Sequence, residues 1–221
     1  MERKHGAYFI SGVDTDCGKT YVTGCLAAYL RHRGVSVITQ KPVQTGCETV
    51  ADDLVEHRKA MGVGIQQEDK ERRTCSYLFR KPASPHLAAR LEGVTIDINK
   101  ISDDTQYLLS KYDVVLVEGA GGLMVPLNDN CLNIEYVAQK KLPLILVASS
   151  KLGGINHALL SIEACKHRNI DLQTLVFNRM PQDDPVLADD AYEVIKKFAL
   201  KQYPEMKVID FRSSDSFWGV F

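Results

Sequence analysis

The chain is poor in the features that mark several classes of protein. Its 27 Lys and Arg nearly balance its 28 Asp and Glu, and no basic block or tail stands out, which argues against a nucleic-acid partner. No apolar run approaches the roughly 18 residues that a membrane-spanning helix needs. The N-terminal residues MERKHGAYFISG are charged and then only briefly apolar. We therefore expect neither a secretory signal nor a membrane partner.

The cysteines are few and scattered. The six of them form no CxxC pair, and no Cys/His cluster has the spacing typical of zinc sites. Unpaired thiols in a chain without a signal segment are typical of a reducing compartment, so we expect a cytoplasmic protein. Internal repeats and low-complexity stretches are absent too.

The 221 residues predict one α/β domain, residues 1–221, because such domains commonly exceed 200 residues. Short apolar runs alternate with helical patterns along the chain. The runs that we interpret as strands are residues 8–11, 35–40, 112–118, 142–148, 172–178 and 207–210. Runs that are continuously apolar are typical of strands buried on both faces of a parallel sheet. The alternation predicts a three-layer α/β fold, with a mostly parallel central sheet and helices on both faces.

Polar or glycine-rich segments follow four of the predicted strands. These segments begin at Gly12, Lys41, Glu118 and Asn178. Ligands of open α/β sheets bind at the carboxyl ends of the strands. We therefore expect these four positions to share one site.

The sequence GVDTDCGKT (residues 12–20) fits the pattern G-x-x-x-x-G-K-[ST] in full, between a predicted strand and a predicted helix. In such a loop, backbone N–H groups surround the phosphates of a nucleotide, and Lys19 reaches the β and γ oxygens. Thr20 offers a hydroxyl to Mg²⁺, and the helix N-terminus adds partial positive charge. The loop predicts a P-loop NTPase-like fold with a nucleotide site. The alternative is a glycine-rich turn that only packs.

Two aspartates, Asp14 and Asp16, lie within this loop. A carboxylate beside a triphosphate is unfavourable unless cations compensate, so they indicate a metal or a further ligand. Asp14 also stands where some dimerising P-loop switches carry a lysine that reaches the partner's nucleotide. An aspartate in place of that lysine disfavours our alternative hypothesis for the function, a P-loop ATPase switch that positions a protein partner.

Two further motifs carry the chemistry that a nucleotide site needs. In QKPVQTG (residues 40–46), Lys41 follows a strand and can hold an oxyanion or a developing charge. In VEGAGG (residues 117–122), Glu118 follows four apolar residues, where its burial would be unfavourable without a cation such as Mg²⁺. A solvated lysine and a glutamate at a strand edge are the alternatives.

Other positions leave a functional and a structural interpretation open. Either Asp52 or Asp53 could bind the metal, or both could simply begin a helix. Residues 153–154 are two glycines before an apparent helix with Asn156 as a possible cap, which suits either a substrate carboxylate or ordinary capping. Asn178 could read a nucleotide base or only form a turn. Cys17 could be an oxidisable thiol or only a small filler residue.

Taken together, the motifs resemble those of the dethiobiotin synthetases. GVDTDCGKT, QKPVQTG, VEGAGGLMVPL, KLGGINHALL and VFN occur in that family's order and spacing, and SPHLAARLEG is similar to its middle segment. The resemblance spans roughly residues 8 to 180. It implies ATP-dependent closure of the ureido ring of dethiobiotin from 7,8-diaminononanoate and CO₂. In that reaction an amine becomes a carbamate, ATP phosphorylates it, and the second amine closes the ring with release of ADP and phosphate.

The resemblance also implies Mg²⁺, a homodimer with the substrate near the subunit interface, and a role for each matching position. The implied catalytic residues are Lys41, Lys19 and Thr15, the last beside the carbamate. The implied nucleotide contacts are Asp16, Cys17, Gly18, Lys19, Thr20, Tyr21, Asp52, Glu118, Gly119, Ala120, Gly121 and Asn178. The implied Mg²⁺ ligands are Thr20, Asp52 and Glu118, with Asp52 preferred to Asp53 by its spacing from QKPVQTG. The implied substrate contacts are Thr45, Gly153, Gly154 and Asn156.

The C-terminal residues depart from the family. Many relatives continue with a strand and a proline-led loop that packs on adenine, whereas this sequence reads VIDFRSSDSFWGVF (residues 208–221). The sequence therefore predicts the phosphate site but not how the base is selected.

Overall fold

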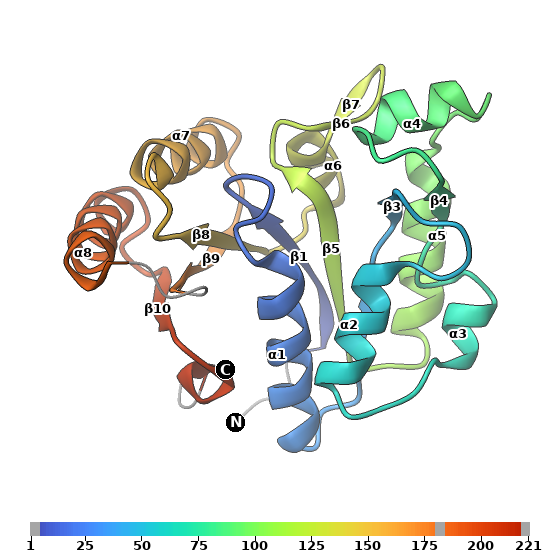
Figure 1. Cartoon of the computed structure of the whole chain (residues 1–221), viewed down its shortest axis with the longest axis horizontal. Helices are drawn as coiled ribbons and strands as arrows, with labels where there is room; N and C mark the ends of the chain where they lie inside the picture. Colours follow the sequence, from blue (N-terminus) through green and yellow to red (C-terminus); the bar gives the residue numbers. More distant parts are fainter. Residues whose placement is uncertain (1–4, 180–183, 218–221) are drawn as a thin grey trace.

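The computed structural model describes residues 5–179 and 184–217. A sheet of six parallel strands forms its centre (Figure 1). In spatial order the strands are β10 (Lys207–Phe211), β9 (Leu172–Asn178), β8 (Leu144–Ser149), β1 (Gly6–Gly12), β5 (Val114–Gly122) and β2 (Val37–Gln40). Each expected strand is present, so the prediction of a mostly parallel sheet is confirmed.

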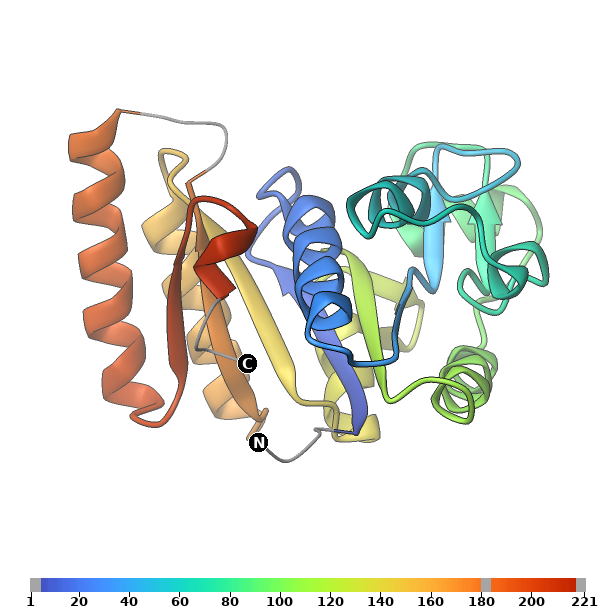
Figure 2. The ribbon, with the colours of Figure 1, turned by 90° about the horizontal axis from the view of Figure 1, so that it is seen from below.

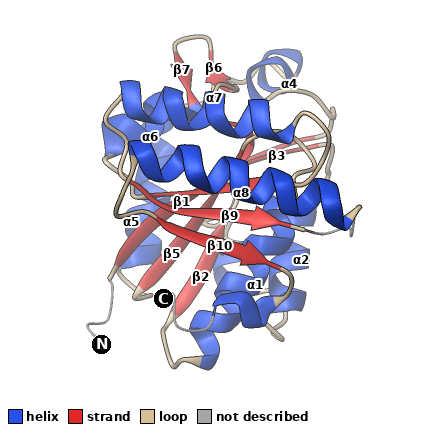
Figure 3. Ribbon diagram, turned by 90° about the vertical axis from the view of Figure 1, so that its left-hand side faces the viewer, coloured by secondary structure: helices blue, strands red, loops and turns tan. Residues whose placement is uncertain are grey.

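Helices cover both faces of this sheet because successive side chains of a strand point to opposite sides. In β5, Val115 and Val117 belong to one hydrophobic core, while Val114 and Leu116 belong to another. The first core includes residues of α5 (Ile98–Leu109), α6 (Asn133–Lys140), α7 (Gly154–His167) and α8 (Pro185–Gln202). The second core includes residues of α1 (Lys19–His32) and the 3₁₀ helix η1 (Ser214–Phe217). Figures 2 and 3 show this three-layer arrangement, which confirms the predicted fold class.

A group of smaller elements lies beyond the β2 edge of the sheet. Figures 1 and 2 place it at the end of the molecule opposite α8. It contains α2 (Asp52–Ala60), α3 (Gln67–Lys70), α4 (Pro85–Leu91) and the parallel pair β3 (Val43–Thr45) and β4 (Tyr77–Phe79). After β5, the short antiparallel pair β6 (Pro126–Asn128) and β7 (Cys131–Leu132) leads into α6. The arrangement brings α2 against α1, close to the carboxyl ends of β1, β5 and β2 (Figure 1).

The C-terminal segment packs on α1, which the sequence did not predict. Phe217 of η1 is fully buried and contacts the rings of Tyr29 and Phe211. Tyr21, at the start of α1, meets Phe211 edge-on with ring centroids 5.8 Å apart. Residues 218–221 of the departing sequence lie outside the described residues. Within the described part of the chain, no helix combines the length and the apolar character that crossing a membrane requires.

Candidate active site

The P-loop connects β1 to α1 at the centre of the sheet. Gly18 has φ 87°, in the left-handed region that favours glycine, and α1 begins with the next residue. A Cβ atom at this position would also collide with the side-chain amide of Asn178, at the end of β9. Both constraints keep residue 18 small, so the backbone N–H groups at the start of α1 stay accessible to an anion.

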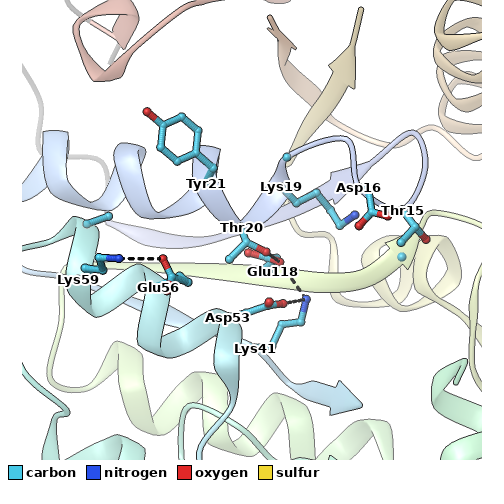
Figure 4. A pocket seen from close by; sticks show the side chains of 13 residues that line it. Thr15, Asp16, Lys19, Thr20, Tyr21, Lys41, Asp53, Glu56, Lys59 and Glu118 are labelled. Atoms are coloured by element: carbon cyan, nitrogen blue, oxygen red, sulfur yellow. Dashed lines mark hydrogen bonds and ion pairs between the residues drawn. The ribbon is translucent and has the colours of Figure 1, made fainter. Parts of the chain in front are cut away.

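A pocket of about 660 Å³ opens in front of this loop (Figure 4). Residues from the P-loop, β5, α2 and the end of β2 line it. The lining residues are Thr15, Asp16, Gly18, Lys19, Thr20, Tyr21, Lys41, Asp53, Glu56, Lys59, Ala60, Glu118 and Gly121. The sequence singled out nine of these positions as nucleotide or catalytic residues, or ten with Asp53. Segments that are distant in sequence therefore meet at one place. Of the four strand-end positions that we expected to share a site, Lys41 and Glu118 line this pocket, whereas Gly12 and Asn178 do not.

Glu118 is the central charge of the pocket, and it is fully buried. Its Oε1 atom accepts hydrogen bonds from Thr20 Oγ1 at 3.0 Å and from Lys41 Nζ at 2.9 Å. Its Oε2 atom lies 2.8 Å from Nε2 of His57, a residue of α2. Lys41 Nζ also contacts Asp53 Oδ2 at 2.6 Å and donates to the Gly119 carbonyl at 3.1 Å. One ammonium group thus neutralises two carboxylates, as Figure 4 shows.

The charges of this pair stabilise each other. Burial alone would raise the pKa of Glu118, but the Lys41 charge and the hydrogen bonds from His57 and Lys41 outweigh burial and hold that pKa well below its usual range. Burial alone would lower the pKa of Lys41, but the carboxylates of Glu118 and Asp53 raise it above its usual value. Both groups are therefore charged at neutral pH.

Lys19 folds back over its own loop, where Nζ donates to the Asp14 carbonyl at 3.0 Å. Asp14 Oδ1 accepts a hydrogen bond from the backbone N–H of Thr15 at 2.7 Å, and Asp14 Oδ2 lies 3.5 Å from Nδ1 of His157. His157 belongs to the first turn of α7. The carboxylate of Asp14 thus has a partner from another element, which explains one of the two aspartates in the loop.

Some predicted contacts lie outside the pocket lining. Cys17 is buried and lies where a Cβ atom on Gly12 would be, which suits the interpretation as a small filler. The Asn178 amide donates to the Cys17 carbonyl at 3.0 Å, so it holds the P-loop in place. Asp52 is exposed at the first position of α2, and Asp53 lines the pocket instead. The choice between these aspartates as metal ligand stays a prediction.

The proposed substrate positions lie on other elements. Thr45 is the last residue of β3. Gly153 is the N-cap of α7, with φ 89°. Asn156 therefore lies inside the helix, and its interpretation as a possible cap was wrong. The contact between His157 and Asp14 brings this first turn of α7 next to the P-loop.

The sequence missed two groups of residues at this site. Glu56 and Lys59 line the pocket from α2, pair with each other at 3.9 Å and are 61 % and 78 % exposed. His57 lies on the buried side of the same helix and contacts Glu118. The signal for His57 was its spacing of three residues from the buried Leu54.

The site offers the oxygen ligands that Mg²⁺ prefers. The described residues hold no group of three or more His, Cys, Asp and Glu side chains arranged as a complete metal site. Mg²⁺ usually binds through one or two carboxylates or hydroxyls, together with waters and the phosphates of a nucleotide. The Thr20 hydroxyl and the ionised Glu118 carboxylate, 3.0 Å apart beside the P-loop, fit that kind of site.

The fold and this loop define a P-loop nucleotide-binding protein. A family model described as an AAA domain matches residues 6–209. The chain is 50 % identical over 207 residues to a protein of Chlorobaculum tepidum named ATP-dependent dethiobiotin synthetase BioD, covering 93 % of this chain and 86 % of that one. A protein of Haemophilus influenzae named ATP-dependent dethiobiotin synthetase BioD 2 is 50 % identical over 179 residues, covering 81 % and 94 %. The chain belongs to the dethiobiotin synthetase family.

Solved structures resemble the fold at low sequence identity. A ParA family ATPase from Chlorobium tepidum matches with a TM-score of 0.53 and 14 % identity, covering 99 % of this chain and 93 % of that one. The hydrogenase maturation factor HypB from Archaeoglobus fulgidus matches with a TM-score of 0.50 and 16 % identity, covering 95 % and 82 %. These likenesses concern the fold alone.

Proposed function

We propose that this protein closes the ureido ring of dethiobiotin from 7,8-diaminononanoate, CO₂ and ATP. The observation that carries the proposal is the convergence of Lys19, Lys41, Thr20 and Glu118 on one pocket, in a chain of this family. Carbamate and γ-phosphate are both anions, so an enzyme that joins them must neutralise their repulsion. Two lysines and a helix N-terminus supply positive charge on both sides of such a pair.

Each residue then has a definite task. Lys19 leaves the Asp14 carbonyl and binds the β and γ oxygens of ATP, while Gly18 and the first N–H groups of α1 bind the phosphates. Lys41 contacts the γ-phosphoryl group and stabilises the charge that spreads over its oxygens during transfer. Thr15 lies beside the carbamate, and Tyr21 and Asn178 lie toward the nucleoside.

Thr20, Glu118 and Asp52 would hold Mg²⁺, which when bound supplies positive charge to the β and γ oxygens. Asp53 has a different role in this proposal, because its carboxylate is already paired with Lys41 at 2.6 Å. It keeps the lysine pointed into the pocket. Gly119, Ala120 and Gly121 present backbone N–H groups along the phosphates or the carbamate.

We propose that the substrate carboxylate binds at the first turn of α7, through Gly153, Gly154 and Asn156, while Thr45 contacts the chain that carries the amines. The partner subunit of a homodimer would supply the α7 contacts.

All six cysteines are free and buried, which suits a reducing cytoplasm.

An assay of coupled turnover tests the function. Purified protein with ATP, Mg²⁺, bicarbonate and 7,8-diaminononanoate should yield dethiobiotin by mass spectrometry, in equal amounts with ADP and phosphate. ATP hydrolysis without the diamine or without bicarbonate should be far slower. Hydrolysis that ignores both compounds and responds to a protein partner would support the alternative, an ATPase switch.

The neighbouring aspartates of α2 form a matched pair for testing the metal ligands. Asp52→Asn should raise the Mg²⁺ concentration needed for half-maximal turnover by about 10-fold, because a ligand is lost. Asp53→Asn should lower kcat instead, with a smaller change in the Mg²⁺ requirement, because Lys41 loses a partner. Mg²⁺ titrations of both variants at saturating ATP measure the difference. The reverse order of effects would make Asp53 the ligand.

A homodimer is the oligomeric state that this proposal requires. Sedimentation equilibrium should give about twice the mass of the chain at micromolar concentration. The catalytic rate per subunit should also fall when the protein is diluted below the dimer's dissociation constant, because the α7 contacts come from the partner. A monomer with full activity at high dilution would contradict the shared site.

A further inference from the structure

Behind Glu118, on the side away from the pocket, lies a row of buried polar side chains that the proposed function does not use. His57 joins Glu118 to Thr39, with Nδ1 of its ring 3.0 Å from Thr39 Oγ1. Arg58 Nη1 donates to Thr39 Oγ1 at 2.7 Å. Arg58 in turn donates to both carboxylate oxygens of Asp69, at 2.9 Å and 2.7 Å. Glu118, His57 and Thr39 are 0 % exposed and Arg58 is 2 % exposed, so bulk water does not reach the part of the row from Glu118 to Thr39.

The hydrogen-bond directions in the row follow from its chemistry. A guanidinium group only donates, so Thr39 Oγ1 must accept from Arg58. The ionised Glu118 carboxylate only accepts, so Nε2 of His57 carries a hydrogen and donates it to Oε2 at 2.8 Å. In the tautomer with its single hydrogen on Nε2, Nδ1 has a free lone pair that accepts the hydroxyl hydrogen of Thr39, 3.0 Å away.

We propose that His57 is a positioning residue for Glu118, in the tautomer that carries its hydrogen on Nε2. This inference rests on the proposed role of Glu118 as a Mg²⁺ ligand. The His57 N–H holds Oε2 on the inner side, so Oε1 alone faces Thr20, Lys41 and the pocket. The carboxylate is thereby kept in one orientation before any ligand arrives. Partners of this kind typically change the affinity of a metal site by about 10- to 100-fold.

His57 does not act on the substrate itself. Its side chain is 0 % exposed, and both ring nitrogens already have partners. It is also absent from the residues that line the pocket. Its influence on the reaction can only pass through the carboxylate of Glu118.

Two substitutions at position 57 separate a positioning role from a space-filling one. The amide nitrogen of glutamine reaches about the place of Nε2, whereas that of asparagine reaches only about the place of Nδ1. Mn²⁺ titration of the protein–ADP complex, followed by electron paramagnetic resonance, measures the metal site without any turnover. His57→Asn should weaken Mn²⁺ binding by about 10-fold or more, and His57→Gln should stay within about threefold of the parent.

If the His57 variants fold poorly, a substitution of Thr39, the hydrogen-bond partner of His57, tests the same role. Thr39→Val removes the hydroxyl but keeps the shape of the side chain, and it should weaken Mn²⁺ binding by about three- to tenfold. Thr174→Val, at a 1 % exposed threonine of β9, is the matched control and should leave Mn²⁺ binding unchanged. The ¹⁵N NMR signals of the His57 ring are those that the parent shows and His57→Gln lacks. In the parent, these signals should show hydrogen on Nε2 and none on Nδ1.

The outcomes distinguish this inference from the proposed function, because no diamine or bicarbonate is present. Equal Mn²⁺ affinities for the Gln and Asn variants, whether retained or lost, would overturn the positioning role. Hydrogen on Nδ1 would overturn the assigned tautomer. If the Asn variant alone loses Mn²⁺ affinity while the parent makes no dethiobiotin, the positioning role stands and the ring-closing function fails. A parent that binds no Mn²⁺ with ADP would overturn both.

Discussion

Replacing Lys41 with alanine is expected to lower kcat at least about 100-fold, which corresponds to about 2.7 kcal/mol of transition-state stabilisation. Lys41 is a buried cation of the pocket, in contact with Glu118 and Asp53. In the proposed reaction it turns to the phosphoryl group as negative charge spreads over the transferred oxygens. An alanine leaves that charge without a donor on this side. Steady-state kinetics at saturating ATP, Mg²⁺ and diamine measure the effect.

The same substitution also leaves Glu118 without its cation, so folding must be measured beside turnover. The thermal midpoint of the ligand-free variant should fall, because a buried carboxylate loses one of its partners. Lys59→Ala is the control, since Lys59 is a lysine of the same pocket that is 78 % exposed and pairs with Glu56. It should change kcat by only a small factor. A fully folded Lys41→Ala variant with near-parental kcat would remove Lys41 from the mechanism.

Replacing Glu118 with glutamine is expected to raise the Mg²⁺ concentration for half-maximal turnover by about 100-fold, the upper end of the range for changes at a metal site. The amide keeps the shape but not the charge. In the parent, His57, Thr20 and Lys41 all donate to the oxygens of Glu118. The NH₂ group of a glutamine would have to face one of these donors, and that hydrogen bond would be lost. Mg²⁺ titrations of turnover at saturating ATP measure the effect. Binding of ADP in the presence of a chelator should change far less.

Glu56→Gln provides the matched control for this substitution. Glu56 lines the same pocket, but it is 61 % exposed and its partner is Lys59. The variant should keep the parental Mg²⁺ requirement. A folded Glu118→Gln variant that also kept it would show that Glu118 is not a metal ligand.

The sequence predicted the fold class because its central strands are unambiguous. β5, β8 and β9 are apolar on both faces, and the alternation with helices leaves few topologies. The order of the strands, with β1 between β8 and β5, depends on contacts between distant segments, which no local pattern encodes. The short strands β3, β4, β6 and β7 have three residues or fewer, too few for a period to appear.

The residues of the site likewise include some that the sequence predicted and some that it missed. Lys19, Lys41 and Glu118 could be predicted because each lies in a motif with a known chemistry. Lys19 begins α1 after the P-loop, Lys41 follows β2, and Glu118 lies within β5, which continues to Gly122 beyond the end that we expected. The row behind Glu118 was missed because a histidine and an arginine in a polar helix suggest a solvated face. A signal was present, however, since Leu54, His57, Arg58 and Met61 recur at intervals of three and four and are all buried. Polar residues on the buried stripe of a helix require partners, and here the partners come from β2, β5 and α3.

The proposed reaction requires this pocket to hold a carbamate and the γ-phosphate of ATP together so that they react. A crystal structure with a nonhydrolysable ATP analogue, Mg²⁺, bicarbonate and 7,8-diaminononanoate would show whether it does. We expect Lys19 Nζ and Lys41 Nζ both to contact the γ-phosphate, with the carbamate adjacent to that phosphate and Glu118 directed at the metal. A triphosphate bound away from Lys41, or a carbamate held apart from the γ-phosphate, would contradict the proposed reaction.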